Sequence, residues 1–363
     1  MKVLALVTEA FGGSGGIAQY NRDFLSALAD SGLVSVIEVV PRNAPNVTTP
    51  ALRIRQVAAR PGRVAYSAAA MRTAIGLRPD VVFCGHLYMV PLAAVLARLT
   101  RARLVVQTHG IEAWPRPGAL RRAAFESAHL VLCVSRYTRA RVLDWATLDP
   151  ERVLVLPNTF DEAFSPGDGS AFRTRWGLGS ARVLLTVGRM DTAERYKGHE
   201  RVIAAIPGLV ARGHDIVYLV IGDGTDRPRL ETLVGASGVA ERIRFIGAVD
   251  HETLKSAYRA ADLFVMPSTG EGFGIAFVEA MASGTPALGL AVAGACDALA
   301  DGALGTAVDE RDFVSALAAA LERPKPDGTA LAAAVRRRFG RERFAAATRA
   351  AMVRMNTATH MDN

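Results

Sequence analysis

The sequence predicts an α/β protein built from two doubly wound, parallel-sheet domains. With 363 residues, the chain is long enough for two domains of ordinary size. Short apolar, β-branched runs alternate with longer segments rich in Ala, Arg and Leu, which is the pattern of parallel strands joined by crossover helices. The alternation breaks once, at 157–181, and then restarts. We therefore expect two Rossmann-like domains that face each other across a cleft, which is a common place for a ligand.

In the first half of the chain, strands and helices are expected to alternate from the first residues. The apolar runs predict strands near 2–8, 34–40, 53–58, 80–84, 103–108, 129–134 and 152–156. The segments between them predict helices near 17–30, 63–77, 89–100, 117–127 and 136–146.

The second half repeats this pattern after the segment 157–181, whose Pro, Gly, Ser and Asp content is typical of a linker. Strands are expected near 182–188, 215–222, 242–247, 262–267, 285–290 and 305–308, and helices near 198–212, 226–237, 250–261, 274–283 and 310–323. The last 35 or so residues predict further helix. We place the domains at 1–162 and 163–340, with 341–363 as a closing helix that packs back on the first domain.

Composition excludes several classes of protein. Half of the residues are hydrophobic and 21% are charged, so the chain can form packed cores and is not disordered. The three cysteines form no C-x-x-C pair, which argues against a disulfide scaffold or a structural zinc site. No apolar run approaches the ~18 residues that a membrane-spanning helix needs. The first residues predict a buried strand rather than a signal peptide, so we expect a cytoplasmic protein.

Positive charge is concentrated in the first half. Residues 1–152 hold 19 Lys and Arg against 10 Asp and Glu, whereas the remainder holds 24 against 25. This asymmetry suggests an anionic partner for the first domain, such as a membrane surface or a lipid phosphate. Arginines without interleaved aromatic residues argue against nucleic acid. The alternative is the Arg usage of a GC-rich genome, because only four residues are Lys.

The most informative stretch is Ser268–Pro286, which follows the apolar strand A-D-L-F-V-M-P. Its Gly272-Phe273-Gly274 run predicts a turn that opens a helix at Ile275. Free backbone amides and the positive helix end would then lie at the carboxyl end of the strand, where ligands bind in sheets of this kind.

Two carboxylates flank this predicted anion site. Glu271 precedes the helix and Glu279 lies about one turn inside it, so the pair could bind hydroxyl groups on either side of a diphosphate. Glu271 could instead only balance the helix dipole. Glu279 could be a solvated helix residue, but its neighbours are apolar.

Two cations are expected at the same crevice. Arg189 ends the first strand of the second domain, in T-V-G-R, and Lys197 begins the next helix, in Y-K-G-H. Two such cations can neutralise a departing diphosphate without a metal ion. No Asp-x-Asp pair is present to hold a metal-bound diphosphate, so we predict no metal site.

In the first domain, a glycine loop and a histidine are the candidates. The loop Gly12–Gly16 precedes a helix and could approach a phosphate closely. Read permissively, Gly13-x-Gly15-x-x-Ala18 fits a dinucleotide-binding fingerprint, with Glu38 expected twenty residues later at the end of the second strand. His109, in T-H-G, is expected at the carboxyl end of a strand, and His86 stands at the end of another, where a structural role is equally compatible.

Together, the E-G-F-G…E helix, the G-R…K-G pair, the glycine loop and the T-H-G turn resemble the retaining glycosyltransferases of family 4, which have the GT-B fold. The resemblance spans nearly the whole chain. The run Ala193–His199 is especially similar to bacterial exopolysaccharide mannosyltransferases. One departure is the run Leu290–Gly294, which replaces the Pro-Glu pair usual in the family and concerns the far wall of the donor pocket.

The resemblance implies a role for each matching position. Arg189 and Lys197 would hold the diphosphate. Glu271 would bind hydroxyls of the donor hexose, Glu279 would bind the ribose hydroxyls, and His109 would contact the hexose near its reacting carbon. The remaining donor contacts would come from Gly15, Gly16, Val249, Gly272, Phe273, Gly274 and Ile275.

The expected activity is therefore metal-independent transfer of a hexose with retention of configuration. We favour mannose from GDP-mannose as donor and a polyprenyl-diphosphate-linked sugar as acceptor, in polysaccharide biosynthesis, with the basic domain docked peripherally on the inner membrane face. Three alternatives stay open: a UDP-hexose-dependent member of the family with another acceptor, an NAD-dependent oxidoreductase, and a non-catalytic nucleotide-sugar-binding protein. The sequence does not fix the donor, the acceptor or the oligomeric state.

Overall fold

The computed structural model describes residues 1–43 and 52–357. The chain divides into two compact units, one formed by Met1–Thr159 with Arg341–Asn363 and the other by Phe160–Gly340. The last residues of the expected closing helix, 358–363, lie outside the described part of the chain. Because each unit has its own sheet, the two are described separately.

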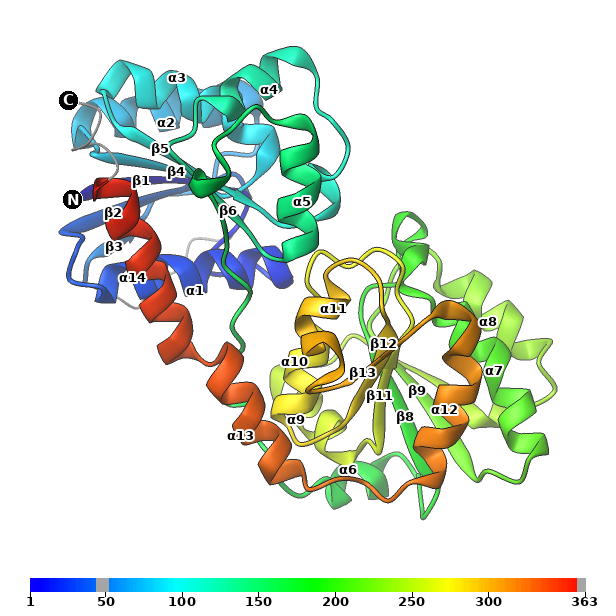
Figure 1. Ribbon diagram of the computed structural model, residues 1–363. Coiled ribbons are helices and arrows are strands. Elements are labelled where there is room, and N and C mark those ends of the chain that lie inside the picture. Colours follow the sequence, from blue (N-terminus) through cyan, green and yellow to red (C-terminus); the bar gives the residue numbers. More distant parts are fainter. Residues whose placement is uncertain (44–51, 358–363) are drawn as a thin grey trace. The chain divides into compact units, whose positions relative to one another are not determined.

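The first unit contains a parallel sheet of seven strands in the order β3-β2-β1-β4-β5-β6-β7 (Figure 1). Its central strands are buried on both faces, which explains their continuous apolar sequences. The strands are β1 (Lys2–Val7), β2 (Val36–Pro41), β3 (Ile54–Gln56), β4 (Val81–Cys84), β5 (Arg103–Thr108), β6 (Leu130–Cys133) and β7 (Val153–Val155).

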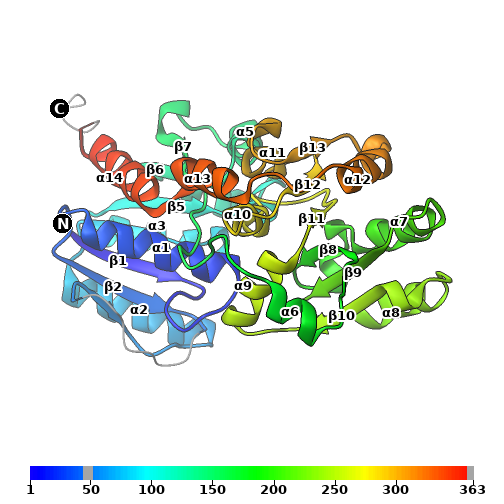
Figure 2. The same cartoon turned by 90° about the horizontal axis from the view of Figure 1, so that it is seen from below.

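Helices cover both faces of this sheet. One face packs against α2 (Arg63–Leu77), α3 (Val90–Thr100), α4 (Ala119–Glu126) and α5 (Arg136–Trp145) in a continuous apolar core. The other face carries α1 (Gly16–Asp30), on which the last helix, α14 (Arg341–Thr357), packs (Figure 2). The Phe344 ring meets the edge of the buried Tyr20 ring at 5.8 Å between centroids. The closing helix therefore belongs to the first unit.

The second unit contains six parallel strands in the order β10-β9-β8-β11-β12-β13. The chain order reverses beside β8, so β8 and β11 are neighbours although the α-helices α7, α8 and α9 and the strands β9 and β10 lie between them in sequence. The strands are β8 (Arg182–Val187), β9 (Ile216–Ile221), β10 (Ile243–Gly247), β11 (Leu263–Met266), β12 (Ala287–Leu290) and β13 (Thr306–Val308).

Two groups of helices enclose the second sheet. An apolar core on one face joins α7 (His199–Ala211), α8 (Arg227–Gly235) and α12 (Phe313–Glu322) to the strands. The other group consists of α6 (Ser170–Arg175), α9 (His251–Ala260), α10 (Ile275–Ala282) and α13 (Gly328–Phe339), with the short α11 (Ala295–Ala298) beside α10. Side-chain caps begin two of these helices: Asp250 accepts a hydrogen bond from the Thr253 amide at α9, and Asp327 accepts from the Thr329 amide at α13.

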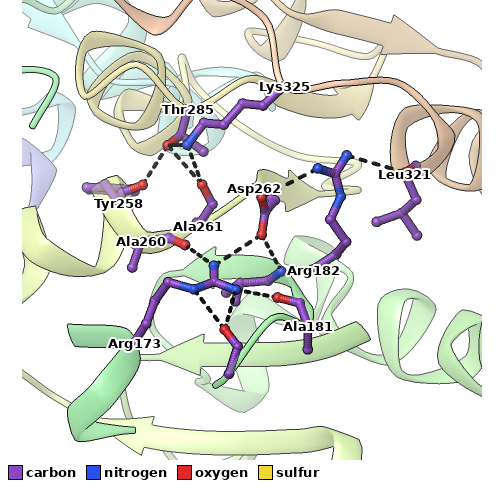
Figure 3. A network of polar contacts seen from close by, with 12 residues as sticks. Arg173, Ala181, Arg182, Tyr258, Ala260, Ala261, Asp262, Thr285, Leu321 and Lys325 are labelled. Carbon is purple, nitrogen blue, oxygen red and sulfur yellow. Dashed lines mark hydrogen bonds and ion pairs between the residues drawn. The ribbon is translucent and has the colours of Figure 1, made fainter. Parts of the chain in front are cut away.

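The segment 157–181 is not wholly irregular, in contrast to the linker expected there. It contains α6, whose Phe172 side chain is buried. Arg173 on α6 donates to the carbonyl oxygens of Ala181 and Ala260 and pairs with Asp262 at 3.3 Å (Figure 3). This segment is therefore fixed to the amino ends of β8 and β11.

The remaining predicted elements agree with the structure to within a few residues at each end, including both predicted parallel sheets. No helix among the described residues is long and apolar enough to span a membrane.

Candidate active site

The main candidate site lies at the carboxyl ends of β8 and β11 in the second unit. Arg189 follows β8, and the loop with Glu271 follows β11. Because these two parallel strands are adjacent, both loops leave the sheet at the same edge. The position lies beside the point where strand order reverses, as ligand sites in such sheets commonly do.

An acidic side chain joins the two predicted cations. The Lys197 ammonium nitrogen lies 3.0 Å from one carboxylate oxygen of Glu194, an ion pair not aligned as a hydrogen bond. The Arg189 guanidinium donates to the other oxygen. The Lys197 side chain is 14% exposed, whereas that of Arg189 is 71% exposed. Glu194 thus connects one enclosed and one open cation.

The sequence context of Lys197 predicted that it begins a helix, and this prediction is wrong. Lys197 ends a 3₁₀ helix, Thr192–Lys197, and α7 begins two residues later. Gly198, between them, has φ 77°, a conformation that other residues rarely adopt. The Tyr196 carbonyl accepts a hydrogen bond of 2.8 Å from the Thr269 amide, which fixes the segment to the loop after β11.

Glu271 lies half-buried in that loop. Its Oε1 atom is enclosed and has no hydrogen-bond partner in the described part of the chain. Burial raises the pKa of Glu271, against the opposing influences of the Lys197 ammonium and a hydrogen bond from Ser268. A buried acceptor without a partner is costly unless a ligand satisfies it. This atom therefore suits a hydroxyl donor.

Glu279 is a buried residue of α10, 7% exposed, and is not a solvated helix side chain. The Tyr258 hydroxyl donates to its Oε2 atom at 3.1 Å. Burial, followed by the Glu279 charge, raises the pKa of Tyr258 well above its usual value. Tyr258 orients this carboxylate. No local pattern predicts the partnership, since it joins residues 21 positions apart.

The turn before α10 has the predicted form. Gly274 precedes Ile275, the first residue of α10, and has φ 93°. A Cβ atom at Gly274 would lie 2.7 Å from the Phe277 ring, so a side chain does not fit there. Phe273 is buried against Phe339, and Gly272 precedes it in the same turn. Val249 lies apart from this turn, between β10 and α9.

In the first unit, the glycine loop leads directly into α1. Gly15 has φ 85° and caps the helix, and Gly16 is its first residue; both are exposed. Arg22, on α1, stabilises the loop by donating hydrogen bonds to the carbonyl oxygens of Ala10 and Gly13, at 3.0 and 2.7 Å. The loop therefore presents exposed backbone at the positive end of α1.

His109 directly follows β5, at its carboxyl end, as predicted. Its Nε2 atom lies 2.9 Å from the Gly85 carbonyl oxygen, which identifies Nε2 as the protonated nitrogen and leaves Nδ1 as an acceptor. The Tyr20 ring and the imidazole form a T-shaped pair, with 5.3 Å between their centroids. Burial lowers the pKa of His109 to about 4, so the ring is neutral at pH 7. His86 lies beside it, 6.2 Å away between ring centroids.

Glu38 does not lie where a dinucleotide site needs an acidic residue. It is the third residue of β2, paired in register with Leu4 and Arg55, and not at the end of the strand as we expected. An acidic residue that binds a ribose in such a fold stands at the strand's carboxyl end. The geometry thus argues against the oxidoreductase alternative.

The structure brings Arg189, Lys197, Glu271 and the α10 turn together in the second unit, while His109 and the glycine loop belong to the first. Within residues 1–43 and 52–357, no group of three or more His, Cys, Asp or Glu side chains could hold a metal ion. Sequence reasoning missed Glu194 and Tyr258. The acid in the E-R-Y-K run was visible, but its ion-pair partners were not.

Comparisons with known families account for both units. Residues 14–164 match the family model described as Glycosyltransferase Family 4, and residues 181–324 match that described as Glycosyl transferases group 1. The two matches together include His109, Arg189, Lys197, Glu271 and Glu279, but not the last two helices.

Two curated relatives are informative. The chain is 36% identical over 252 residues to a D-inositol 3-phosphate glycosyltransferase of Geodermatophilus obscurus, covering 65% of this chain and 55% of the relative. It is 33% identical over 250 residues to a GDP-mannose-dependent alpha-(1-6)-phosphatidylinositol monomannoside mannosyltransferase of Mycolicibacterium smegmatis, covering 64% of each. The matches thus span less than two thirds of these relatives' lengths.

Solved structures show the same fold. HepE of Anabaena, in complex with UDP-glucose, has a TM-score of 0.76 at 18% identity, covering 97% of this chain and 99% of that one. Sucrose-phosphate synthase from Thermosynechococcus elongatus has a TM-score of 0.75 at 22% identity and full coverage of both chains. This two-sheet architecture is therefore the GT-B fold.

Proposed function

Because the chain belongs to glycosyltransferase family 4, we propose that it transfers a hexose from a nucleotide sugar to an acceptor hydroxyl group, without a metal ion and with retention of configuration. One observation carries the proposal. Lys197 and Arg189 lie beside the loop of Glu271, whose Oε1 atom is enclosed, at the edge of the sheet where ligands bind.

The chemistry of transfer explains these residue types. Breaking the bond between the sugar and the phosphate creates negative charge on the departing diphosphate. Fixed cations and helix amides that are already directed at this charge stabilise the transition state, because they need not reorganise during the reaction. Arg189 and Lys197 would supply the cations, and the Gly274–Ile275 amides at the start of α10 would supply the helix end.

The carboxylates would hold the groups on either side of the diphosphate. Glu271, whose Oε1 atom has no partner within the described residues, would accept hydroxyl groups of the hexose. Glu279, oriented by Tyr258, would accept the ribose hydroxyls. The neutral His109 would contact the hexose through its acceptor nitrogen, Nδ1. The leaving phosphate would take the proton of the acceptor hydroxyl, so that attack comes from the face of the leaving group and configuration is retained.

GDP-mannose is the favoured donor. The relative in Mycolicibacterium smegmatis is named as GDP-mannose-dependent, and the run Ala193–His199 is similar to bacterial mannosyltransferases. A UDP-hexose is the alternative donor, since HepE was solved with UDP-glucose. The favoured acceptor is a lipid-linked sugar in polysaccharide synthesis, which the basic first unit could approach at an anionic membrane surface.

The test of this function is transfer activity in variants of the diphosphate site. Lys197→Ala should lower turnover with GDP-mannose or UDP-glucose by about a hundredfold, the usual effect of losing one transition-state donor. Lys255→Ala is the matched control, because Lys255 pairs with Glu252 on α9. Near-wild-type turnover in the Lys197 variant, with wild-type melting, would contradict the assignment.

A further inference from the structure

The most unexpected feature of the candidate site is the acidic residue between its two cations. The two carboxylate oxygens of Glu194 each take one cation, Oε1 the Arg189 guanidinium and Oε2 the Lys197 ammonium. We propose that Glu194 is an internal competitor for these cations, which a donor diphosphate must displace and which helps to expel the nucleoside diphosphate after transfer. The proposal rests on the function proposed above.

The geometry favours competition because the carboxylate uses the charges that a diphosphate would need. Glu194 is 13% exposed and Lys197 is 14% exposed, so this ion pair is largely shielded from solvent. Asp191 gives Arg189 a second acidic neighbour, but at 3.9 Å and on the open side. A diphosphate carries more charge than one carboxylate and would therefore win the exchange, with its net affinity reduced by the displaced pair.

The segment that carries Glu194 is anchored on both sides of it. Before it, the Thr192 amide donates to the Thr225 hydroxyl at 3.1 Å. After it, Arg195 pairs with the buried Asp226 at 2.7 Å. Glu194 itself has non-helical dihedral angles, φ −115° and ψ 24°, within the 3₁₀ helix. The residues that flank Glu194 are therefore held by contacts that do not involve its carboxylate.

A like charge nearby adds to the tendency of Glu194 to leave. The Glu194 charge acts to raise the pKa of Glu271 and also that of Tyr196, which shows that the two carboxylates lie within electrostatic reach of each other. Lys197 interacts with both carboxylates: it pairs with Glu194, and its charge acts to lower the pKa of Glu271. Once a diphosphate holds Lys197, the attraction that keeps Glu194 beside Glu271 is weaker.

Competition and simple positioning predict opposite results. If Glu194 competes with the diphosphate, removal of its charge should tighten binding of a nucleoside diphosphate. If Glu194 only holds the cations in place, removal should weaken that binding. A nucleoside without phosphates should bind equally well in either case, because it does not use the cations.

The experiment is calorimetric titration of GDP, UDP and the matching nucleosides into wild type, Glu194→Gln and Glu194→Ala. We expect both variants to bind the nucleoside diphosphate about tenfold more tightly, the equivalent of one charged hydrogen bond, with nucleoside binding unchanged. Single-turnover and steady-state rates should then show slower product release. Glu200→Gln is the control. Glu200, on α7, carries the same charge as Glu194 but pairs with Arg229 of α8, at 2.7 Å.

The possible results distinguish failure of the competitor role of Glu194 from failure of the proposed glycosyltransferase function. Equal or weaker binding of the nucleoside diphosphate by well-folded Glu194 variants would overturn the competitor role and leave the glycosyltransferase assignment intact. If wild-type protein bound neither GDP nor UDP, the proposed function itself would fail, and the competitor role with it. Tightening in Glu200→Gln as well would reduce the effect to net charge and would also overturn the proposal.

Discussion

At the scale of single residues, Glu271 is the side chain whose environment most requires a ligand. It combines an enclosed oxygen without a partner in the described residues and a pKa raised by burial. Lys197 acts against that shift, because its positive charge favours the carboxylate form. A hexose hydroxyl would supply the missing donor.

Glu271→Gln should therefore lower kcat by about a hundredfold, because an amide cannot accept hydroxyl hydrogen bonds as strongly as a carboxylate. Steady-state transfer assays would measure the loss. Glu252→Gln, an exposed carboxylate on α9, is the matched control. A Glu271→Gln enzyme with more than half of wild-type kcat would exclude a role of this carboxylate in the reaction.

His199 predicts a pH dependence of stability. Its imidazole is 4% exposed, and burial, followed by the charge of Lys197, lowers its pKa from 6.5 to about 4. Between these pH values the unfolded chain binds the proton and the folded chain does not, so stability falls as pH falls from 6.5 towards 4. At pH 5 the expected loss from this group is about 1–2 kcal/mol.

Urea unfolding at pH 7 and pH 5 would measure this loss, with His199→Leu as the comparison. The variant should lose less stability than wild type over the same pH interval. Equal slopes in the two proteins would show that His199 is not the responsible group.

The place of a site residue could be predicted from the sequence only where a local pattern determines it. Arg189, Lys197 and Glu271 stand in recognisable turns after strands, so their common edge of the sheet follows from topology. The partnership of Tyr258 with Glu279 depends on how α9 and α10 pack, which no local pattern specifies. The expected place of Glu38, at the end of its strand, was wrong because β2 continues for three residues beyond it, to Pro41.

At the scale of elements, alternating apolar runs predicted the strands well because parallel strands are buried on both faces. The elements that were missed are short: α6 and the 3₁₀ helix Thr192–Lys197 each have six residues, and α11 has four. Segments of that length are too short for a helical period to be distinct. Tertiary contacts, such as those of Arg173, determine them instead.

The amino ends of β8 and β11 depend on one carboxylate. Asp262 accepts a hydrogen bond from the Val183 amide at 2.7 Å and pairs with Arg173 and with Arg182 (Figure 3). Lys325, which donates to the neighbouring Ala261 carbonyl, brings the segment before α13 to the same place. This network joins α6, the starts of β8 and β11, and the segment before α13.

Asp262→Asn should destabilise the protein by about 2 kcal/mol, because two partly buried guanidinium groups lose their shared anion. Chemical unfolding would measure the change. The control is Asp312→Asn, because the exposed carboxylate of Asp312 pairs with its chain neighbour Arg311. Equal stability of the Asp262 and Asp312 variants would contradict the anchoring role.

At the scale of the whole molecule, two independent parallel sheets and an excess of positive charge in the first half were both evident in the sequence. In the first unit, α2 and α4 each expose an apolar residue next to an arginine in their first turn, Val64 beside Arg63 and Leu120 beside Arg121. Such mixed positions suit contact with an anionic lipid surface.

Binding to vesicles should therefore increase with anionic lipid content and decrease with salt, since each basic residue near the surface contributes about 1 kcal/mol. Co-sedimentation with vesicles of neutral or anionic phospholipid would measure it. Arg121→Ala with Leu120→Ala should weaken binding, whereas Arg311→Ala in the second unit should not. Binding that is independent of both lipid charge and salt would argue against a membrane role.

The central claim is that the second unit binds a nucleoside diphosphate through Arg189, Lys197 and the start of α10 without a metal ion. The most direct measurement is the melting temperature with GDP, UDP, ADP or NAD⁺, each with and without EDTA. A ligand at about 100 times its dissociation constant adds about 2.7 kcal/mol to the stability of the state that it binds. We predict a shift with GDP or UDP that EDTA does not remove and that Lys197→Ala abolishes. A shift with NAD⁺ alone, or one that disappears with EDTA, would contradict the account.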